Sequence, residues 1–335
     1  MSQRSRVGIA GFTGYSGAEL LRILKGHPDV DPVLLEHRAV SDSELPFGET
    51  APRFPFTPEG LKDSGVELVF LATSLEVSIE SAPMLLDAGL KCIDLSAAFR
   101  LRTLSNYTRW YNVEHPRLDL LTEAVYGLPE YFREVTKLAR LVANPGCYPT
   151  AANLSLRPLI AEGVLDRAAG IVCDAKSGAS GAGRKPLLKT HFCEVTENVS
   201  AYGVLYHRHV PEVLLTSDLQ EYEFSFTAQL LPVHRGILET IYVRTMEPMS
   251  HSDLTAVYEK YYKDEPFVRI YPEGRLPDLS EVRLTNFCDI GMTVDPETRR
   301  VVIVAAIDNL VKGAAGQAVQ NMNLLLGYDE TSALL

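Results

Sequence analysis

The sequence predicts an α/β protein of two domains, in which an N-terminal doubly wound parallel sheet precedes an α+β domain with a mixed sheet. Three observations lead to this fold class. A chain of 335 residues exceeds the usual size of a single domain. In its first third, short apolar segments alternate with helical patterns, which is typical of parallel strands joined by helices. Farther along, longer strand-like segments follow one another with few helices between them.

The first domain is predicted from alternating strand and helix patterns. Residues 6–10 form a short buried strand, and a glycine-rich turn leads into a helix over 16–25, where Leu20, Leu21 and Leu24 repeat at helical spacing. Further strands are predicted at 32–36, 66–72, 91–95 and 140–143, with a helix at 77–88.

The second domain has a different pattern. Its predicted strands are longer and cover 224–231, 236–245 and 301–307, with helices at 212–222 and 250–262. The last segment, 309–326, is rich in Ala, Gln and Leu and predicts a closing helix.

The composition excludes several classes of protein. With 32 Lys and Arg against 43 Asp and Glu, the net charge of −11 argues against a partner such as nucleic acid or an anionic membrane. The longest apolar run, residues 301–307, is too short for a membrane span, which needs about 20 apolar residues. Glu19 and Arg22 interrupt the apolar N-terminal stretch before it resembles a secretion signal, so we expect a cytoplasmic chain.

The five cysteines predict neither a disulfide framework nor a metal site. Their number is odd, and no Cys-x-x-Cys pair occurs. Cys92 and Cys173 lie inside apolar strand-like segments and are interpreted as core residues, together with Cys193 and Cys288. Cys147 is the exception, because Pro-Gly before it and Tyr-Pro after it place it on a turn.

The turn after the first strand predicts a dinucleotide site and makes the first domain Rossmann-like. Gly11, Gly14 and Gly17 let the backbone turn tightly and approach a pyrophosphate, and the N–H groups at the start of the helix favour an anion. The hydroxyls of Thr13 and Ser16 add hydrogen-bond donors.

The end of the second strand decides between two cofactors. Glu36 would accept a hydrogen bond from a ribose 2′-hydroxyl and favour NAD, whereas His37 and Arg38 would pair with a 2′-phosphate and favour NADP. The residues alone leave both alternatives open.

Cys147 has the position of a nucleophile. A strand ends before Asn144, a tight turn follows, and a helix is predicted to begin near Pro149, a residue suited to the first helical position. The N–H dipoles at a helix start favour the thiolate and lower the pKa of a thiol from its usual value of about 8.5.

Two histidines are candidate proton partners for this thiol. Residues 206–211 are interpreted as the end of a strand, where a period of two would place His207 and His209 on one face and Arg208 on the other. A histidine there would protonate an oxyanion or polarise a carbonyl. His-x-His is also a possible metal pair, but no third ligand is suggested nearby.

A basic glycine-rich segment predicts an anionic substrate. Residues 175–193 contain Lys176, Arg184, Lys185 and Lys189 and no carboxylate. The dense Gly and Ser between 177 and 183 imply a backbone that approaches a ligand closely, although a flexible surface loop would share this composition.

Together these motifs resemble one family, the N-acetyl-gamma-glutamyl-phosphate reductases of arginine biosynthesis, within the semialdehyde dehydrogenase group. The resemblance covers nearly the whole chain. Its specific motifs are Asn-Pro-Gly-Cys-Tyr-Pro-Thr at 144–150, Ser-Gly-Ala-Ser-Gly-Ala-Gly-Arg at 177–184 and His-Arg-His at 207–209. More N-terminal matches lie at 11–20, 70–74, 94–100 and 126–130, and C-terminal ones at 235–237 and 309–315.

The resemblance implies roles for individual residues and favours NADP(H). It implies Cys147 as nucleophile and His209, or else His207, as acid/base. The cofactor-binding residues implied are Gly11, Thr13, Gly14, Tyr15, Ser16, Gly17, Arg38, Ser74, Ser177, Gly178, Asn309 and Lys312. The substrate-binding residues implied are Arg100, for the substrate phosphate, with Asn144, Ser180, Gly181, Arg184, Tyr206 and Arg208.

The resemblance also implies the domain roles and the reaction. Residues 1–145, closed by the helix 309–327, would bind the dinucleotide, and residues 146–308 would carry catalysis and dimerisation in a dimer or tetramer. The implied reaction is NADPH-dependent reduction of N-acetyl-L-glutamyl 5-phosphate to the 5-semialdehyde through a Cys147 thioester. Aspartyl phosphate or a carrier-bound amino-adipyl phosphate is the alternative substrate. A dinucleotide-binding regulator is the alternative from another class, since it would need no activated thiol.

Overall fold

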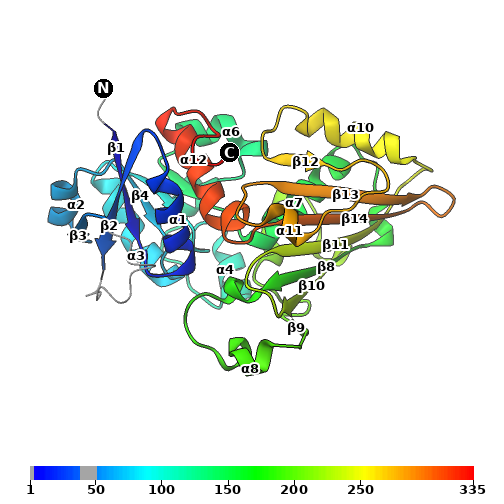
Figure 1. The fold of residues 1–335 in the computed structure, drawn as a ribbon, viewed down its shortest axis with the longest axis horizontal. Coiled ribbons are helices and arrows are strands. Elements are labelled where there is room, and N and C mark those ends of the chain that lie inside the picture. The colour runs from blue at the N-terminus through cyan, green and yellow to red at the C-terminus, as the bar shows by residue number, and fades with distance from the viewer. Residues whose placement is uncertain (1–3, 38–50) are drawn as a thin grey trace. The chain divides into compact units, whose positions relative to one another are not determined.

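The first unit of the structure is built on a parallel sheet that contains β1 near its middle (Figure 1). The computed structural model describes residues 4–37 and 51–335, and the chain divides into Met1–Pro145 with Ala314–Leu335 as one unit and Gly146–Gly313 as the other. Within the described residues, the strand order is β3-β2-β1-β4-β5-β7-β6, and every pair is parallel.

The elements of this unit follow the predicted alternation of strands and helices. Its strands are β1 (Ser5–Ala10), β2 (Val30–Glu36), β3 (Arg53–Pro55), β4 (Leu68–Leu71), β5 (Lys91–Asp94), β6 (Val125–Tyr126) and β7 (Leu141–Ala143). Its helices are α1 (Tyr15–Lys25), α2 (Pro58–Ser64), α3 (Leu75–Asp87), α4 (Leu104–Tyr111), α5 (Leu118–Glu123), α6 (Pro129–Leu138) and α12 (Gly316–Leu326). The chain leaves β1 toward β2 on one side and later places β4 on the other, so the topological switch point lies at the carboxyl end of β1.

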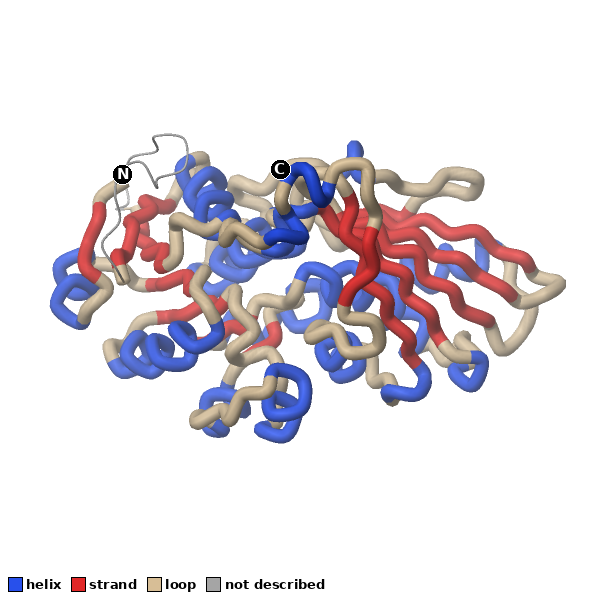
Figure 2. The backbone as a smooth tube through the Cα atoms, turned by 90° about the horizontal axis from the view of Figure 1, so that it is seen from below, coloured by secondary structure: helices blue, strands red, loops and turns tan. Residues whose placement is uncertain are grey.

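The second unit is a mixed sheet, as the sequence predicted, and Figure 2 shows its long strands side by side in red. The order is β12-β13-β14-β11-β8-β10-β9 among the described residues, with parallel pairs β8–β10 and β12–β13 and antiparallel pairs elsewhere. The strands are β8 (Ile171–Gly178), β9 (Ser200–Tyr202), β10 (Phe224–Leu231), β11 (Ile237–Arg244), β12 (Val268–Ile270), β13 (Cys288–Asp295) and β14 (Arg300–Ile307). The helices are α7 (Cys147–Ala161), α8 (Phe192–Val195), α9 (Val210–Thr216), α10 (His251–Tyr262) and α11 (Leu279–Val282).

Three sequence predictions about the second unit and the segment that follows it are wrong in detail. The helix predicted over 212–222 ends at Thr216, because Asp218 adopts the left-handed conformation with φ of 53°. The closing helix predicted from 309 begins at Gly316, after a π-turn over Val311–Ala315. Cys193 is exposed on α8, so it is not a core residue, whereas Cys92, Cys173 and Cys288 are buried as predicted.

No helix among the described residues is long and apolar enough to cross a membrane.

A carboxyl group is buried in the middle of the second sheet. Along β11, alternate residues face the core, and Glu239 occupies one of these inward positions with no solvent exposure. Neither of its carboxyl oxygens has a hydrogen-bond partner of good geometry among the described residues, although the thiol of Cys173 on β8 lies beside the carboxyl group. Burial raises the pKa of Glu239 well above its usual range. The folded protein therefore holds Glu239 in its neutral form.

Glu239→Gln should make the protein more stable than wild type, and the difference should grow as the pH rises. The folded-state pKa of Glu239 lies above the unfolded one, so its contribution to stability is intact below about pH 4.3 and is lost as the pH rises toward the folded value. The loss is about 1.4 kcal/mol per pH unit in that interval, and glutamine escapes it because it does not titrate. Urea unfolding at pH 5, 6 and 7 measures the difference. Glu247→Gln, an exposed position, is the control and should show no such trend.

Candidate active site

The second unit contains a pocket of about 390 Å³ at the start of α7 and the end of β8. Segments far apart in the sequence form its wall: the glycine-rich stretch after β8, the short turn Leu188–Thr190, strand β9 and the loop before α9. The lining residues are Cys147, Tyr148, Ser177, Gly178, Gly181, Ala182, Leu187, Lys189, Thr190, Tyr202, Gly203, Tyr206, His207, Arg208, His209 and Leu230. The predicted nucleophile and both candidate histidines therefore lie in one pocket.

Cys147 is the first residue of α7, two positions earlier than the predicted start. Gly146 is the N-cap, and among the described residues no side chain caps this helix end. The first-turn N–H groups of a helix carry partial positive charge, and this location favours the thiolate over the thiol. Cys147 is half-buried and lines the pocket, so it is accessible from there.

Two contacts fix the backbone at Cys147. The carboxylate of Glu212, only 1% exposed, accepts a hydrogen bond of 2.9 Å from the Gly146 N–H. On the other side Gly313, in the π-turn, packs so closely that a Cβ there would lie 2.7 Å from the Cβ of Cys147. Neither residue was predicted as part of the site. Glu212 lies three residues after His209, so its position near a candidate catalytic residue could have pointed to it. Nothing in the sequence pattern places Gly313 against the cysteine.

The strand predicted for residues 206–211 is wrong, although both histidines do meet. The segment is a series of turns, in which Gly203 and Leu205 have positive φ angles and the Tyr206 N–H donates to the Gly203 carbonyl. Turns remove the period of two, so Arg208 lines the same pocket as its neighbours instead of facing away. The rings of His207 and His209 lie 4.9 Å apart, centre to centre.

The two histidines differ in their chemical state. Burial lowers the pKa of His207 to about 4, with the neighbouring Arg208 guanidinium as the second cause. His207 is therefore neutral near pH 7, and its Nδ1 accepts a hydrogen bond from the His209 N–H. That bond places the proton of His207 on Nε2. His209 precedes α9 as its N-cap residue and is 7% exposed.

Two tyrosines that the sequence did not assign to the site complete this wall. The hydroxyls of Tyr148 and Tyr202 share a hydrogen bond of 2.9 Å, and the ring of Tyr148 packs edge-on against His207. Burial raises the pKa of both phenols, so they remain protonated donors. Tyr148 follows Cys147 directly in the sequence. Tyr202 lies 54 residues after Tyr148, and the folding of the chain brings the two hydroxyls together.

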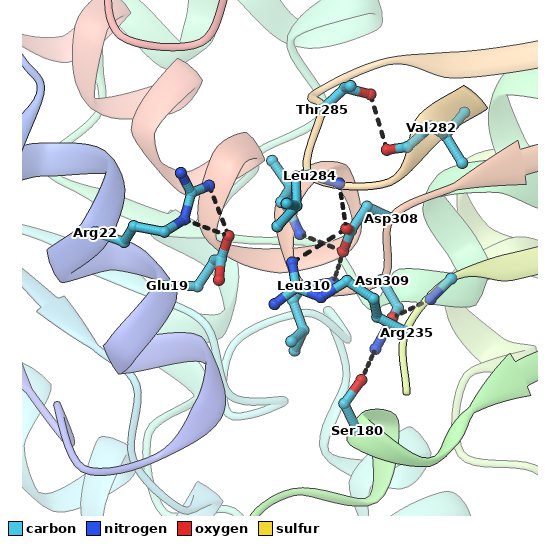
Figure 3. Close-up of polar contacts among 12 residues, drawn as sticks. Glu19, Arg22, Ser180, Arg235, Val282, Leu284, Thr285, Asp308, Asn309 and Leu310 are labelled. Carbon is cyan, nitrogen blue, oxygen red and sulfur yellow. Dashed lines mark hydrogen bonds and ion pairs between the residues drawn. The ribbon is translucent and has the colours of Figure 1, made fainter. Parts of the chain in front are cut away.

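A buried polar network supports the glycine-rich stretch (Figure 3). The side chain of Asn309 accepts from the Gly236 N–H at 2.7 Å and donates to the Ser180 hydroxyl at 3.0 Å. Beside it, the unexposed carboxylate of Asp308 forms an ion pair with Arg235 and accepts from the backbone N–H of Leu310. Both side chains thus hold backbone on which Ser177, Gly178 and Gly181 line the pocket.

The predicted substrate residues fall into three groups. Gly181, Tyr206 and Arg208 line the pocket, whereas Ser180 and Arg184 are not part of its wall. Arg100 and Asn144 belong to the first unit. There the Arg100 guanidinium donates to the carbonyls of Asn144 and Leu95, at 2.8 and 2.9 Å. The Asn144 amide donates to the Ala314 carbonyl and accepts from Asn321. These contacts hold the segment that leads into Cys147.

The glycine turn of the first unit brings backbone segments close together at the start of α1. Gly11 has φ of 84°, and a Cβ there would lie 2.2 Å from the Ala72 carbonyl oxygen, so only glycine fits. Gly14 is the N-cap of α1, and among the described residues no side chain caps this helix and no acidic residue lies in its first turn. Thr13, Tyr15, Ser16 and Gly17 belong to the same turn or first helical turn.

The other predicted cofactor residues are distributed over both units. Ser74 is the N-cap of α3 in the first unit. Asn309 and Lys312 are buried in the second unit, where the Lys312 ammonium lies 5.6 Å from the ring centre of Phe267. Arg38, the residue on which the NADP choice depended, lies outside the described residues.

Comparisons with known proteins match nearly the whole chain. The semialdehyde dehydrogenase NAD binding domain matches residues 6–139, and the semialdehyde dehydrogenase dimerisation domain matches 147–309. The N-acetyl-gamma-glutamyl-phosphate reductase of Symbiobacterium thermophilum is 47% identical over 98% of this chain and 97% of its own.

Two solved structures share the fold. One is aspartate semialdehyde dehydrogenase II of Vibrio cholerae, complexed with ASA, at 20% identity, a TM-score of 0.73, and 97% and 99% coverage of the two chains. The other is aspartate semialdehyde dehydrogenase of Candida albicans, solved with NADP. It has 15% identity, a TM-score of 0.68 and the same coverage of the two chains. At these identities the likeness concerns the fold alone.

Gly313→Ala should slow alkylation of Cys147. The added methyl group would lie 2.7 Å from the cysteine Cβ, so the helix start or the π-turn must shift, at a cost of roughly 1–3 kcal/mol. Mass spectrometry of the Cys147 peptide after timed iodoacetamide treatment separates it from the exposed Cys193. Gly26→Ala is the matched control, because Gly26 has right-handed helical angles and room for a Cβ. Equal rates in wild type and Gly313→Ala would contradict the close packing.

Proposed function

Because the chain belongs to the N-acetyl-gamma-glutamyl-phosphate reductase family of semialdehyde dehydrogenases, we propose that Cys147 is its nucleophile and His209 its acid/base. The protein is an NADP-dependent oxidoreductase of arginine biosynthesis. It reduces N-acetyl-L-glutamyl 5-phosphate to N-acetyl-L-glutamate 5-semialdehyde and phosphate. The observation that carries the proposed roles is the shared pocket, which is lined by a cysteine at a helix N-terminus and by a pair of histidines.

The covalent step begins at the Cys147 sulfur. The thiolate attacks the acyl carbon of the substrate, a C–S bond forms, and the C–O bond to phosphate breaks. The product is a thioester on Cys147 and free phosphate. The hydrogen bond from the Gly146 N–H to the Glu212 carboxylate fixes the backbone next to the reacting sulfur.

The next step needs a proton donor at the same carbon. NADPH, when bound, supplies the hydride that reduces the thioester. His209 protonates the resulting oxyanion, and collapse of the thiohemiacetal releases the aldehyde and regenerates the cysteine. His207 is neutral and directed by its bond to the His209 N–H, so it orients a polar group of the substrate instead of losing or gaining a proton.

The residues of the first unit fit a dinucleotide. The turn from Gly11 to Gly14 and the start of α1 would hold the pyrophosphate, since Gly11 permits the close backbone approach and the helix end offers N–H groups. Glu36 forms an ion pair with Arg53, which engages the carboxylate that would otherwise repel a 2′-phosphate. The contact of Arg38 with that phosphate stays a prediction, as does the cytoplasmic location.

We also propose that the second unit forms a homo-oligomer. The family model that matches residues 147–309 is described as a dimerisation domain. Consistent with this, the sheet exposes large apolar side chains, with Val172 on β8 and Tyr242 on β11 at 45% and 46% exposure. These two residues face each other across the β8–β11 pair. The proposed assembly is a dimer or a tetramer of this chain.

Cys147→Ser should abolish reduction and leave NADPH binding intact. A serine hydroxyl at the start of α7 remains protonated, so it cannot replace the thiolate as nucleophile, whereas the glycine turn lies in the other unit. Turnover is followed by NADPH absorbance, and binding by quenching of NADPH fluorescence. The exposed Cys193→Ser serves as control and should keep full activity. Retained turnover in Cys147→Ser would rule out the assigned nucleophile.

His209→Asn should lower kcat by about 10²- to 10⁴-fold and remove a limb of the pH–rate profile. His207→Asn should keep that limb, because a group with a pKa of about 4 does not titrate between pH 5.5 and 9. The measurement is kcat from pH 5.5 to 9 for wild type and both variants. If His207→Asn loses the limb and His209→Asn keeps it, the two roles are reversed.

A further inference from the structure

We propose that Lys189 binds the α-carboxylate of the substrate and so selects glutamyl substrates by the end that does not react; this inference rests on the proposed function. Lys189 lies in the turn Leu188–Thr190, and it lines the same pocket as Cys147 and the two histidines. In the sequence it was only one of four basic residues in the segment 175–193, with no reason to separate it from the others.

The ammonium group of Lys189 is held at the pocket wall by weak contacts. It lies 5.0 Å from the ring centre of Tyr202 and donates to the Ala201 carbonyl at a long 3.4 Å. Tyr202 in turn is fixed by the hydrogen bond to Tyr148, the residue after Cys147. A cation–π contact and one long hydrogen bond position the amine but leave its other donors for a ligand.

The charge of Lys189 is not neutralised within the described part of the chain. None of the described carboxylates forms an ion pair with it, although Glu194 lines a neighbouring hollow of about 190 Å³ that Lys189 also lines. By contrast, Lys176 of the same segment is paired with Asp174 at 2.8 Å. A cation at a pocket wall with no internal counter-ion is suited to an anionic ligand.

The location of Lys189 favours the carboxylate over the phosphoryl group. The phosphoryl group is attached to the carbon that Cys147 attacks, whereas the α-carboxylate lies at the far end of the glutamyl chain. Lys189 stands where the pocket adjoins the neighbouring hollow, and neither Cys147 nor either histidine lines that hollow. Lys189 thus borders a part of the cavity that the reacting groups do not line, and this is where we place the α-carboxylate.

The reverse reaction tests this assignment, because it presents the two anions on separate molecules. With NADP⁺, the enzyme oxidises N-acetyl-glutamate semialdehyde, which carries only the α-carboxylate, in the presence of inorganic phosphate. Lys189→Ala should raise KM for the semialdehyde by about 10- to 100-fold, the loss of one charge-assisted hydrogen bond, and leave KM for phosphate unchanged. Lys189→Arg, which keeps the charge, should recover most of the affinity.

Two controls separate a specific contact from general electrostatics. Lys185→Ala removes the same charge four residues away, at an exposed position outside the pocket wall, and should change neither KM. The methyl ester of the semialdehyde lacks the anion, so wild type and Lys189→Ala should use it equally well.

Three results would overturn the inference: an unchanged KM for the semialdehyde in Lys189→Ala, an increase confined to phosphate, or an equal increase in Lys185→Ala. Wild-type enzyme that fails to oxidise the semialdehyde with NADP⁺ and phosphate would overturn the proposed function itself, and this inference with it. The two failures are therefore distinguishable by the wild-type rate alone.

Discussion

The packing of Gly313 against Cys147 is the constraint on which the arrangement of the second unit depends. The helix start that carries the sulfur can approach the π-turn only because residue 313 has no side chain. The start of the π-turn is fixed by Asp308, whose carboxylate accepts hydrogen bonds from the N–H groups of Leu310 and Val311. Asn309 extends the same support to the glycine-rich stretch through Ser180. One short segment near the end of the chain thus fixes two walls of the pocket.

The parts of the fold and site that the sequence predicted are those fixed by local physics. A glycine with a positive φ, as at Gly11, and the Pro-Gly pair before Cys147 indicate a turn before any tertiary contact is known. The bounds of a long strand such as β10 were also predicted to the residue, because its apolar and polar side chains alternate along the sequence.

What the sequence could not provide is the set of contacts between distant segments. The pair His207 and His209 was placed on a strand, yet the turns at Gly203 and Leu205 bring the rings together and add Arg208 to the same wall. Tyr202 and Glu212 reach Cys147 only through sheet pairing and the packing of α9. The hydrogen bond between Ser180 and Asn309 is another contact between distant segments that the sequence did not indicate.

The close packing of Gly313 against Cys147 also limits which substitutions this protein can accept during evolution. Every single-nucleotide change in a glycine codon that gives another amino acid introduces a Cβ, and at this position any Cβ collides with the cysteine. No missense step from Gly313 is therefore conservative. Because residues in contact do not contribute independently, a larger residue could be accepted only after the backbone around Cys147 had moved first. The order in which mutations arise, and not only their identity, decides which sequences of this lineage remain functional.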